Sequence, residues 1–323
     1  MIPLRDTIPS KNYPVVNNAI IGINILVFII QLLQGPALND FVYLYGLVPA
    51  RYSIPHIAYY FSATEQIFSL ISFMFLHGGF LHLISNMWTL YIFGDNVEDR
   101  LGPVRYLFFY LACGLSSGLT HLIFNYYSDF PTIGASGAIA GVMGAYFILY
   151  PQAKILTLIP IIIIPWIIEI SAFFFLAFWF LLQFINAAGS NGQAGGIAWW
   201  AHIGGFVFGI LLLKILLKIP ETGLTGMTKS LTEKKKSHRL QIIRPVGSGN
   251  DIDLHGILQI TAYEAILGAQ KIVSVSHGFR KKLYKIVVPP GLDDGSVLRL
   301  KGLGLEKDDG LKGDLLLKMV IES

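Results

Sequence analysis

The chain has 323 residues, of which 54% are hydrophobic and only 14% are charged, and its mean hydropathy is +0.60. Soluble domains carry about 25% charged residues, so this composition excludes a purely soluble protein and a disordered one. Residues 1–220 hold 8 Lys or Arg and 8 Asp or Glu, which leaves 16 of the 24 cations and 12 of the 20 anions to the last 103 residues. We therefore expect a membrane body followed by a soluble region, and no nucleic-acid partner.

Six stretches are apolar enough to cross a bilayer as helices. They are residues 15–33, 80–94, 103–124, 134–150, 170–185 and 198–217. A further apolar stretch, 155–168, is short and is interrupted by Pro160 and Pro165, so we expect a re-entrant or interfacial segment there. The predicted fold is an all-α membrane bundle of six transmembrane helices, followed by a small soluble domain that resembles a β-sandwich.

Cationic side chains flank the predicted spans mainly at one end. Arg5 precedes the first span, Arg105 lies between the second and third, Lys154 follows the fourth, and Lys218 follows the sixth. Such residues collect on the cytoplasmic side of membrane helices. If the chain has six spans, the helix ends that carry these cations all lie on the same side of the membrane. We expect both termini in the cytoplasm, a multi-pass protein of the plasma or inner membrane, and no cleavable signal peptide.

The predicted domain boundaries follow the change in composition. Residues 1–219 form the membrane domain, residues 220–239 form a basic juxtamembrane linker, and residues 240–323 form the β domain. The linker is either a solvated tether or a patch for anionic lipid headgroups. Short runs typical of strands, and one short helix at 262–267, lie between turn signals in the last domain. The runs are 256–261, 271–276, 282–288, 297–301 and 314–321.

Polar side chains inside a bilayer are costly, so each one within a span is a candidate functional residue. His82 and Asn86 lie near the start of the second span, Ser136 near the start of the fourth, and His202 near the start of the sixth. These three spans run in the same direction across the membrane. All four residues are therefore expected within about two helical turns of the same, outer surface.

Ser136 and His202 are a possible nucleophile and its base. A serine hydroxyl is a weak nucleophile until a base removes its proton, and His202 is the histidine of the later spans that could do so. Glycines at i, i+4 spacing in both spans allow the two backbones to approach closely. They are Gly137 and Gly141, and Gly205 and Gly209. The alternative interpretation is that these glycines only pack helices and that Ser136 bonds to its own backbone.

His82 and Asn86 are four residues apart and so share one helix face. Donors on one face suit an oxyanion hole, joined by the backbone N–H groups of Ser136 and Ala135, where the start of a helix favours negative charge. The alternative for His82 and Asn86 is an interhelical hydrogen-bonded pair.

Neither an acidic third member nor a metal site accompanies the predicted dyad. Glu169, the acid between Ser136 and His202, is expected at the opposite end of the fifth span. Cys113 is the single cysteine, and the histidines of the membrane domain lack a matching set of carboxylates or thiols. We therefore expect a Ser–His dyad without metal or cofactor.

The motifs around these residues resemble those of the rhomboid family of intramembrane serine proteases. The resemblance covers about residues 1–218 and rests on HGG at 77–79, HLISN at 82–86, the turn at 98–102, GASG at 134–137 and AHIGG at 201–205. It implies a six-helix core, Ser136 as nucleophile, His202 as general base, and His82 and Asn86 beside the oxyanion. It also implies membrane-protein substrates within the lipid bilayer. Phe68-Ser69 stands where many members have Trp-Arg, and Ala140 where some have an aromatic residue.

Residues 240–323 resemble a C-terminal β domain of the DnaJ chaperones. The resemblance rests on 262–268, YKIVVPPG at 284–291, VLRLKGLG at 297–304 and GDLL at 313–316. It implies a peptide-binding or regulatory module with a peptide or chaperone-type partner. The expected function of the chain is an intramembrane serine endopeptidase that cleaves transmembrane segments near the outer membrane face. The alternatives are a catalytically silent adaptor that binds membrane helices, and an esterase at the lipid interface.

Overall fold

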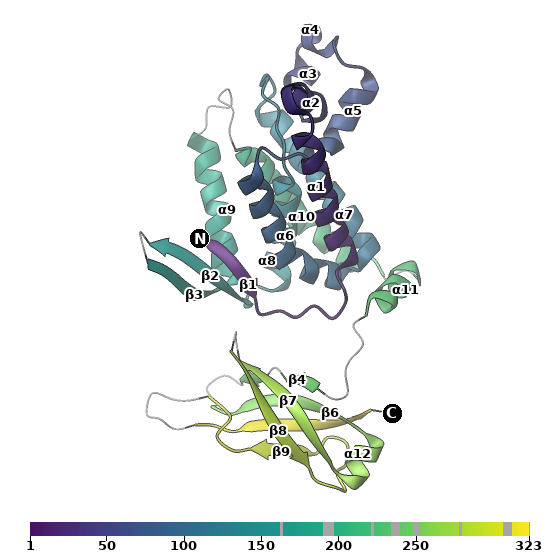
Figure 1. Cartoon of the computed structure of the whole chain (residues 1–323), viewed down its shortest axis with the longest axis vertical. Coiled ribbons are helices and arrows are strands. Elements are labelled where there is room, and N and C mark those ends of the chain that lie inside the picture. The colour runs from purple at the N-terminus through teal and green to yellow at the C-terminus, as the bar shows by residue number, and fades with distance from the viewer. Residues whose placement is uncertain are drawn as a thin grey trace. The chain divides into compact units, whose positions relative to one another are not determined.

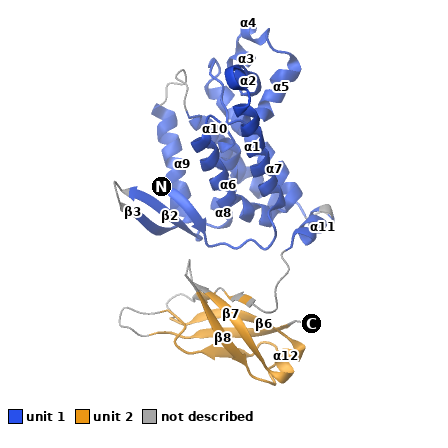
Figure 2. Cartoon of the chain, in the orientation of Figure 1, with its two compact units in different colours: residues 1–234 blue, residues 235–323 orange. Residues whose placement is uncertain are grey.

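The structure is a computed structural model that describes residues 1–161, 164–189, 197–220, 223–233, 240–243, 245–247, 252–277, 280–305 and 312–322. The chain divides into two compact units, residues 1–234 and 235–323 (Figure 2). Part of the predicted linker belongs to the first unit, because residues 223–232 form helix α11 (Gly223–Thr232). The backbone N–H of Tyr13 donates to the carbonyl of Thr232 at 2.8 Å. The basic residues 234–239 lie outside the described residues.

The first unit is mainly helical (Figure 1). Its other helices are α1 (Val15–Leu32), α2 (Leu38–Tyr45), α3 (Ala50–Ser53), α4 (Pro55–Ala58), α5 (Ala63–Ser72), α6 (Phe80–Leu101), α7 (Pro103–Phe124), α8 (Ser136–Leu149), α9 (Ala172–Gly189) and α10 (Trp199–Lys218), with the 3-10 turns η1 (Gly35–Ala37) and η2 (Phe73–Phe75). The six predicted spans correspond to α1, α6, α7, α8, α9 and α10. Helix α6 continues seven residues beyond the predicted end at residue 94.

Four of the described helices are long and apolar enough to cross a membrane, namely α1, α7, α9 and α10. The pair Ala63–Phe75 and Phe80–Leu101 passes the same test together but bends by 78° at its break, which gives up to five spans. Helix α8 is apolar but has only 14 residues, and residues 137–146 of it are all buried. A helix that is apolar on every side belongs in the centre of a bundle. The membrane-spanning helical region is confirmed, and the number of six spans stays a prediction.

One face of α1 carries three buried amide side chains at intervals of seven residues, or about two helical turns. They are Asn17, Asn24 and Gln31. The Nδ2 of Asn17 donates to the carbonyl of Leu90 at 3.2 Å, and its Oδ1 accepts from the hydroxyl of Tyr106 at 2.7 Å. Because buried amides need such partners, Asn17 fixes α1 against α6 and α7 in one register.

The apolar stretch at 155–168, for which the sequence predicts a re-entrant or interfacial segment, is a β-hairpin. Strands β2 (Lys154–Ile161) and β3 (Ile164–Ser171) are antiparallel, and β1 (Ile2–Asp6) pairs with the other edge of β2. The run is rich in β-branched isoleucine, which favours strands. Pro160 and Pro165, which exclude a continuous helix, lie opposite each other in the ladder.

The second unit consists of two sheets and one short helix. Its four-stranded sheet has the order β5 (Val246–Gly247), β6 (Leu254–Thr261), β10 (Leu315–Glu322), β9 (Val297–Leu300). Its three-stranded sheet has the order β4 (Leu240–Ile243), β7 (Ala269–His277), β8 (Arg280–Val288), and helix α12 is Ala262–Leu267. Alternate residues such as Leu258 and Ile260, or Leu317 and Met319, are buried in one core. The predicted strand-rich region is confirmed; strands β4 and β5 were not predicted.

Candidate active site

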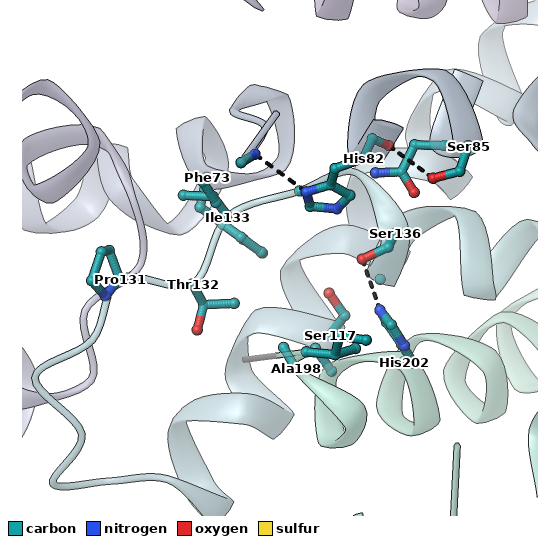
Figure 3. Close-up of a pocket in the computed structure, with 16 residues that line it drawn as sticks. Phe73, His82, Ser85, Ser117, Pro131, Thr132, Ile133, Ser136, Ala198 and His202 are labelled. Carbon is teal, nitrogen blue, oxygen red and sulfur yellow. Dashed lines mark hydrogen bonds between the residues drawn. The ribbon is translucent and has the colours of Figure 1, made fainter. Parts of the chain in front are cut away.

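Ser136 and His202 are in hydrogen-bond contact. Ser136 is the first residue of α8, and His202 lies one turn into α10. The Oγ of Ser136 and the Nε2 of His202 are 2.8 Å apart (Figure 3). The histidine is only 8% exposed. The fold therefore joins two residues that are 66 positions apart, at the same ends of two neighbouring helices, as the shared depth of the spans predicts.

Glycines at the contact between α8 and α10 make this distance possible. A Cβ atom on Gly205 would lie 2.0 Å from the carbonyl oxygen of Gly137, and one on Gly209 would lie 2.3 Å from that of Gly141. Cβ atoms do not occur at such distances, so any side chain at these positions would force the helices apart. The close approach that the glycine spacing predicts is present.

His82, in the first turn of α6, faces Ser136 from another side. Its Nδ1 accepts a hydrogen bond from the backbone N–H of Gly78 at 3.2 Å. Because a backbone N–H can only donate, the neutral imidazole carries its proton on Nε2. A Cβ atom on Gly134 would lie 2.9 Å from this Nε2 and 3.6 Å from the Oγ of Ser136. Only a glycine therefore fits between the Nε2–H donor and the serine.

Asn86 and Ala135 add further donors at the same place. The Asn86 side chain is buried, and its Nδ2 has no hydrogen-bond partner among the described residues. Ala135 is the N-cap residue of α8, and no side chain in the described part of the chain caps this helix end. The first N–H groups of a helix lack intrahelical acceptors. Unpaired donors beside a serine hydroxyl can stabilise an oxyanion.

The segment that leads into Ser136 is fastened at three points. The Thr132 hydroxyl lies 2.8 Å from the Nε2 of His121, a histidine to which the sequence analysis gives no role. Thr132 also exchanges two backbone hydrogen bonds with Leu47, and the N–H of Gly134 donates to the carbonyl of Phe73 at 2.9 Å. Gly134 has φ of +132°, a conformation that other residues rarely adopt. These contacts set the position of the backbone on one side of the site.

Two cavities meet at the dyad. One, of about 490 Å³, lies between the segment 131–134 and the first turns of α6, α8 and α10, and Figure 3 shows the residues around it. The other, of about 280 Å³, is lined by residues of α6, α8, α9 and by residues 1–3 of the N-terminal strand. Both include Asn86, Ser136 and His202. The serine is therefore reached from two directions.

His202 has a second polar contact that the sequence analysis does not predict. Its Nδ1 lies 2.8 Å from the Oε1 of Gln183 on α9. The ring of Trp179 lies beside the imidazole, with 5.9 Å between the ring centroids. Gln183 is the one amide in the apolar run 172–185, so its isolated polarity was a signal that could have identified it.

The described residues contain no group of three or more His, Cys, Asp or Glu side chains that could hold a metal ion. The residues that the structure brings together at the site are a serine, a histidine and neutral hydrogen-bond donors. Such a set is suited to acyl transfer, in which a serine oxygen attacks a carbonyl carbon.

These features define a helical membrane protein with a buried serine–histidine pair. Residues 64–219 match the Rhomboid domain, and residues 244–323 match the DnaJ C terminal domain. The chain thus carries a rhomboid domain joined to a DnaJ C terminal domain, and both resemblances seen in the sequence are confirmed.

Several rhomboid proteins are similar to this chain. Rhomboid protein 1, mitochondrial, of Saccharomyces cerevisiae is 32% identical over 198 residues, which are 60% of this chain and 51% of that protein. RHOMBOID-like protein 6, mitochondrial, of Arabidopsis thaliana is 34% identical over 157 residues, 48% of this chain and 45% of that protein. Rhomboid protease GluP of Bacillus subtilis is 37% identical over 83 residues, 26% of this chain and 16% of that protein.

The chain spans about half the length, or less, of these relatives. Two of their names refer to mitochondria, so the comparisons do not favour the expected plasma membrane over another membrane. The membrane and the side on which the termini lie stay predictions.

Proposed function

We propose that this chain is an intramembrane serine endopeptidase that cleaves membrane-protein substrates with Ser136 and His202. The observation that carries the proposal is the 2.8 Å contact between the Oγ of Ser136 and the Nε2 of His202 inside a helical membrane body. The match to the Rhomboid domain supports it, as does the similarity to a relative named as a rhomboid protease.

In this reaction His202 is the general base and then the general acid. Its Nε2 takes the hydroxyl proton of Ser136 as the Oγ attacks the scissile carbonyl carbon, and it returns that proton to the leaving amine. Water, activated by the same imidazole, then hydrolyses the acyl-enzyme and frees the serine. The cavities on both sides of the dyad leave room for an extended peptide and for water.

The carbonyl oxygen of the substrate becomes negatively charged in this step. The donors that would stabilise it in this mechanism are the Nε2–H of His82, the Nδ2 of Asn86, and the N–H groups of Ala135 and Ser136. The loss of one such donor raises the barrier by about 3 kcal/mol, or about 100-fold in rate. Asn86→Ala should therefore slow cleavage strongly without preventing the Ser136–His202 contact.

The proposal is tested with the purified full chain in proteoliposomes that contain a single-span membrane substrate. Wild type should cleave it, and Ser136→Ala and His202→Ala should not. Ser117→Ala is a matched control, because the Ser117 hydroxyl lies in the same cavity but donates to the carbonyl of Gly114. If wild type cleaves no faster than Ser136→Ala, the enzyme proposal fails and the silent adaptor is favoured. Cleavage of lipid esters without cleavage of peptides would favour the esterase.

We further propose that the second unit binds peptide segments or a chaperone-type partner, and that both termini face the cytoplasm. The match of residues 244–323 to the DnaJ C terminal domain supports the first statement, and the flanking cations support the second. The role of the second unit is tested by deleting residues 240–323 and measuring cleavage. A changed cleavage rate would mean that the unit controls activity, and an unchanged rate would mean that it only recruits a partner. The orientation of the chain is tested with a tag at each terminus. In intact cells, an added protease should leave both tags uncleaved if both termini face the cytoplasm.

A further inference from the structure

His202 is held between two hydrogen-bond partners on opposite sides of its ring. Its Nε2 lies 2.8 Å from the Oγ of Ser136, and its Nδ1 lies 2.8 Å from the Oε1 of Gln183. Both His202 and Gln183 are buried, with 8% and 5% exposure. A buried amide in an apolar helix is costly unless both of its ends are paired, and here both are.

The second end of the amide identifies which atom faces the histidine. The Nε2 of Gln183 donates to the backbone carbonyl of Trp179, one turn earlier in α9, at 3.1 Å. A carbonyl oxygen accepts and cannot donate, so the NH₂ group must point at Trp179 and the oxygen must point at His202. The Nδ1 of His202 is therefore the protonated nitrogen, and the Nε2 is the free acceptor opposite Ser136.

We propose that Gln183 is a positioning residue that fixes His202 in the tautomer and ring orientation in which Nε2 can take the proton of Ser136. This inference rests on the proposed protease function, and it adds a third, neutral member to the dyad. An acceptor behind the base also stabilises the imidazolium that forms when the proton moves. Gln183 does this with a carbonyl dipole, without placing a carboxylate inside the membrane body.

Among the described residues, the other groups around the His202 ring do not provide an acceptor for its Nδ1–H. Helices α8 and α9 carry no charged residue, and the rings that flank the imidazole are those of Trp179 and Trp199, at 5.9 and 6.2 Å between centroids. The titratable side chains that act electrostatically on His202 from the other packed helices are His82 of α6 and His121 of α7. Trp179 thus contributes twice, since its ring lies beside the imidazole and its carbonyl orients the amide.

The test compares the rate of fluorophosphonate labelling of Ser136 across pH in the full chain. Gln183→Met has a similar shape but no acceptor, and should label about ten-fold more slowly, the loss expected for one neutral hydrogen bond. The acid limb of its pH profile, where the labelling rate falls as His202 becomes protonated, should move to lower pH. The reason is that the imidazolium of His202 loses the acceptor that stabilises it. Gln183→Glu restores an acceptor, so it should label faster than Gln183→Met and move the acid limb to higher pH.

Asn186→Leu is the matched control. Asn186 lies three residues further along α9 and is exposed, and its side chain donates to the carbonyl of Leu182 in the same helix, so its loss should change neither rate nor pH profile. A structural role of Gln183 alone would lower the amount of folded protein but leave the pH profile of the remainder unchanged. Unchanged rates and acid limbs in both Gln183 variants would overturn the inference.

A spectroscopic test does not depend on any Gln183 variant. In wild type with ¹⁵N-labelled histidine, the signals that disappear in His202→Ala should be those of a ring with a protonated Nδ1 and a bare Nε2. A proton on Nε2 at neutral pH would overturn the inference. If instead wild type labels no faster than Ser136→Ala while His202 shows the expected tautomer, the protease proposal fails and the Gln183 contact stands.

Discussion

Gln31 and His77 exchange two hydrogen bonds across 46 residues of sequence. The Nε2 of Gln31 donates to the carbonyl of His77 at 3.1 Å, and the N–H of His77 donates to the Oε1 of Gln31 at 2.9 Å. The next residue, Gly78, donates its N–H to the Nδ1 of His82. Helix α1, which contributes no residue to the proposed dyad, therefore holds the backbone that sets the tautomer of His82.

Gln31→Leu should destabilise the membrane unit and slow the reaction. The substitution leaves a buried N–H and a buried carbonyl of His77 without partners, and each unpaired group costs about 1–3 kcal/mol. We expect a lower midpoint of thermal unfolding in detergent and slower labelling of Ser136. Gln34→Leu is the control, since Gln34 is half-buried and its side-chain Nε2 donates to the carbonyl of Ile30, one turn earlier, at 2.9 Å. Equal unfolding midpoints and labelling rates for Gln31→Leu and wild type would show that the two hydrogen bonds between Gln31 and His77 do not hold this backbone in place.

Gly205→Val should separate Ser136 from His202. Its side chain would meet the carbonyl oxygen of Gly137, a backbone atom that cannot move without α8. Overpacking of this kind costs about 1–3 kcal/mol, and a shift of α10 away from α8 would lengthen the 2.8 Å contact between Ser136 and His202 beyond hydrogen-bond distance. We expect cleavage and labelling to be lost. Gly22→Val in α1 is the control, because a Cβ there meets nothing within 4 Å and activity should persist. Normal activity of Gly205→Val would show that the helices do not depend on this contact.

The sequence was sufficient to predict the six main helices of the first unit and the grouping of the polar residues, but not helices α2 to α5 or α11. Hydropathy placed the six long helical stretches, and the alternation of direction placed Ser136 and His202 at one depth. Both inferences rest on properties that every residue of a span shares, namely its apolarity and its direction. They need no knowledge of which helix lies beside which.

Gln183, His121 and the amides of α1 were missed for the opposite reason. Each is a polar residue in a largely apolar helix, and its partner is known only when the neighbouring helix and its rotation are known. The hairpin at 154–171 was missed because an apolar, isoleucine-rich run has no periodicity that separates a strand from a membrane segment. Its pairing with residues 2–6 joins chain segments about 150 positions apart, which no local pattern reports.

The second unit should lose stability as the pH falls below about 4.5. Burial raises the pKa of Glu264, but hydrogen bonds from Lys271, at 2.7 Å, and from the N–H of Thr261 outweigh it, so the pKa lies below 4.5. A lowered folded-state pKa stabilises the fold above the unfolded-state value and is lost as the pH falls through the folded value. Hydrogen exchange of the β6 amides in the full chain, corrected for the intrinsic rate, measures this loss.

Glu264→Gln should flatten that pH dependence, and Lys271→Met should flatten it less, because the N–H of Thr261 still donates to the Glu264 carboxylate in that variant. In both variants a smaller loss of stability at low pH should remain. It comes from Asp314, whose pKa is lowered by the N–H of Gly302 and by Arg299. If the protection of β6 in Glu264→Gln falls with pH as steeply as in wild type, the pair is not responsible.

Thr132→Val should loosen the segment that carries Gly134 to the dyad. The variant keeps the shape of the side chain but leaves the Nε2 of buried His121 without its partner, which costs about 1–3 kcal/mol. We expect a lower unfolding midpoint and slower cleavage. Thr120→Val is the control, because the Thr120 hydroxyl donates to the carbonyl of Ser116 in its own helix and so fastens no second segment among the described residues.

The double variant His121→Leu, Thr132→Val separates an unpaired group from a lost contact. If the damage in Thr132→Val comes from a buried imidazole nitrogen without a partner, removing the imidazole as well should recover much of the stability, since no polar group is then left unpaired. Cleavage should recover less, because the segment is still not fastened to α7. Additive losses of stability in the double variant would instead mean that the two side chains act independently, and His121 would then have no role in holding the site.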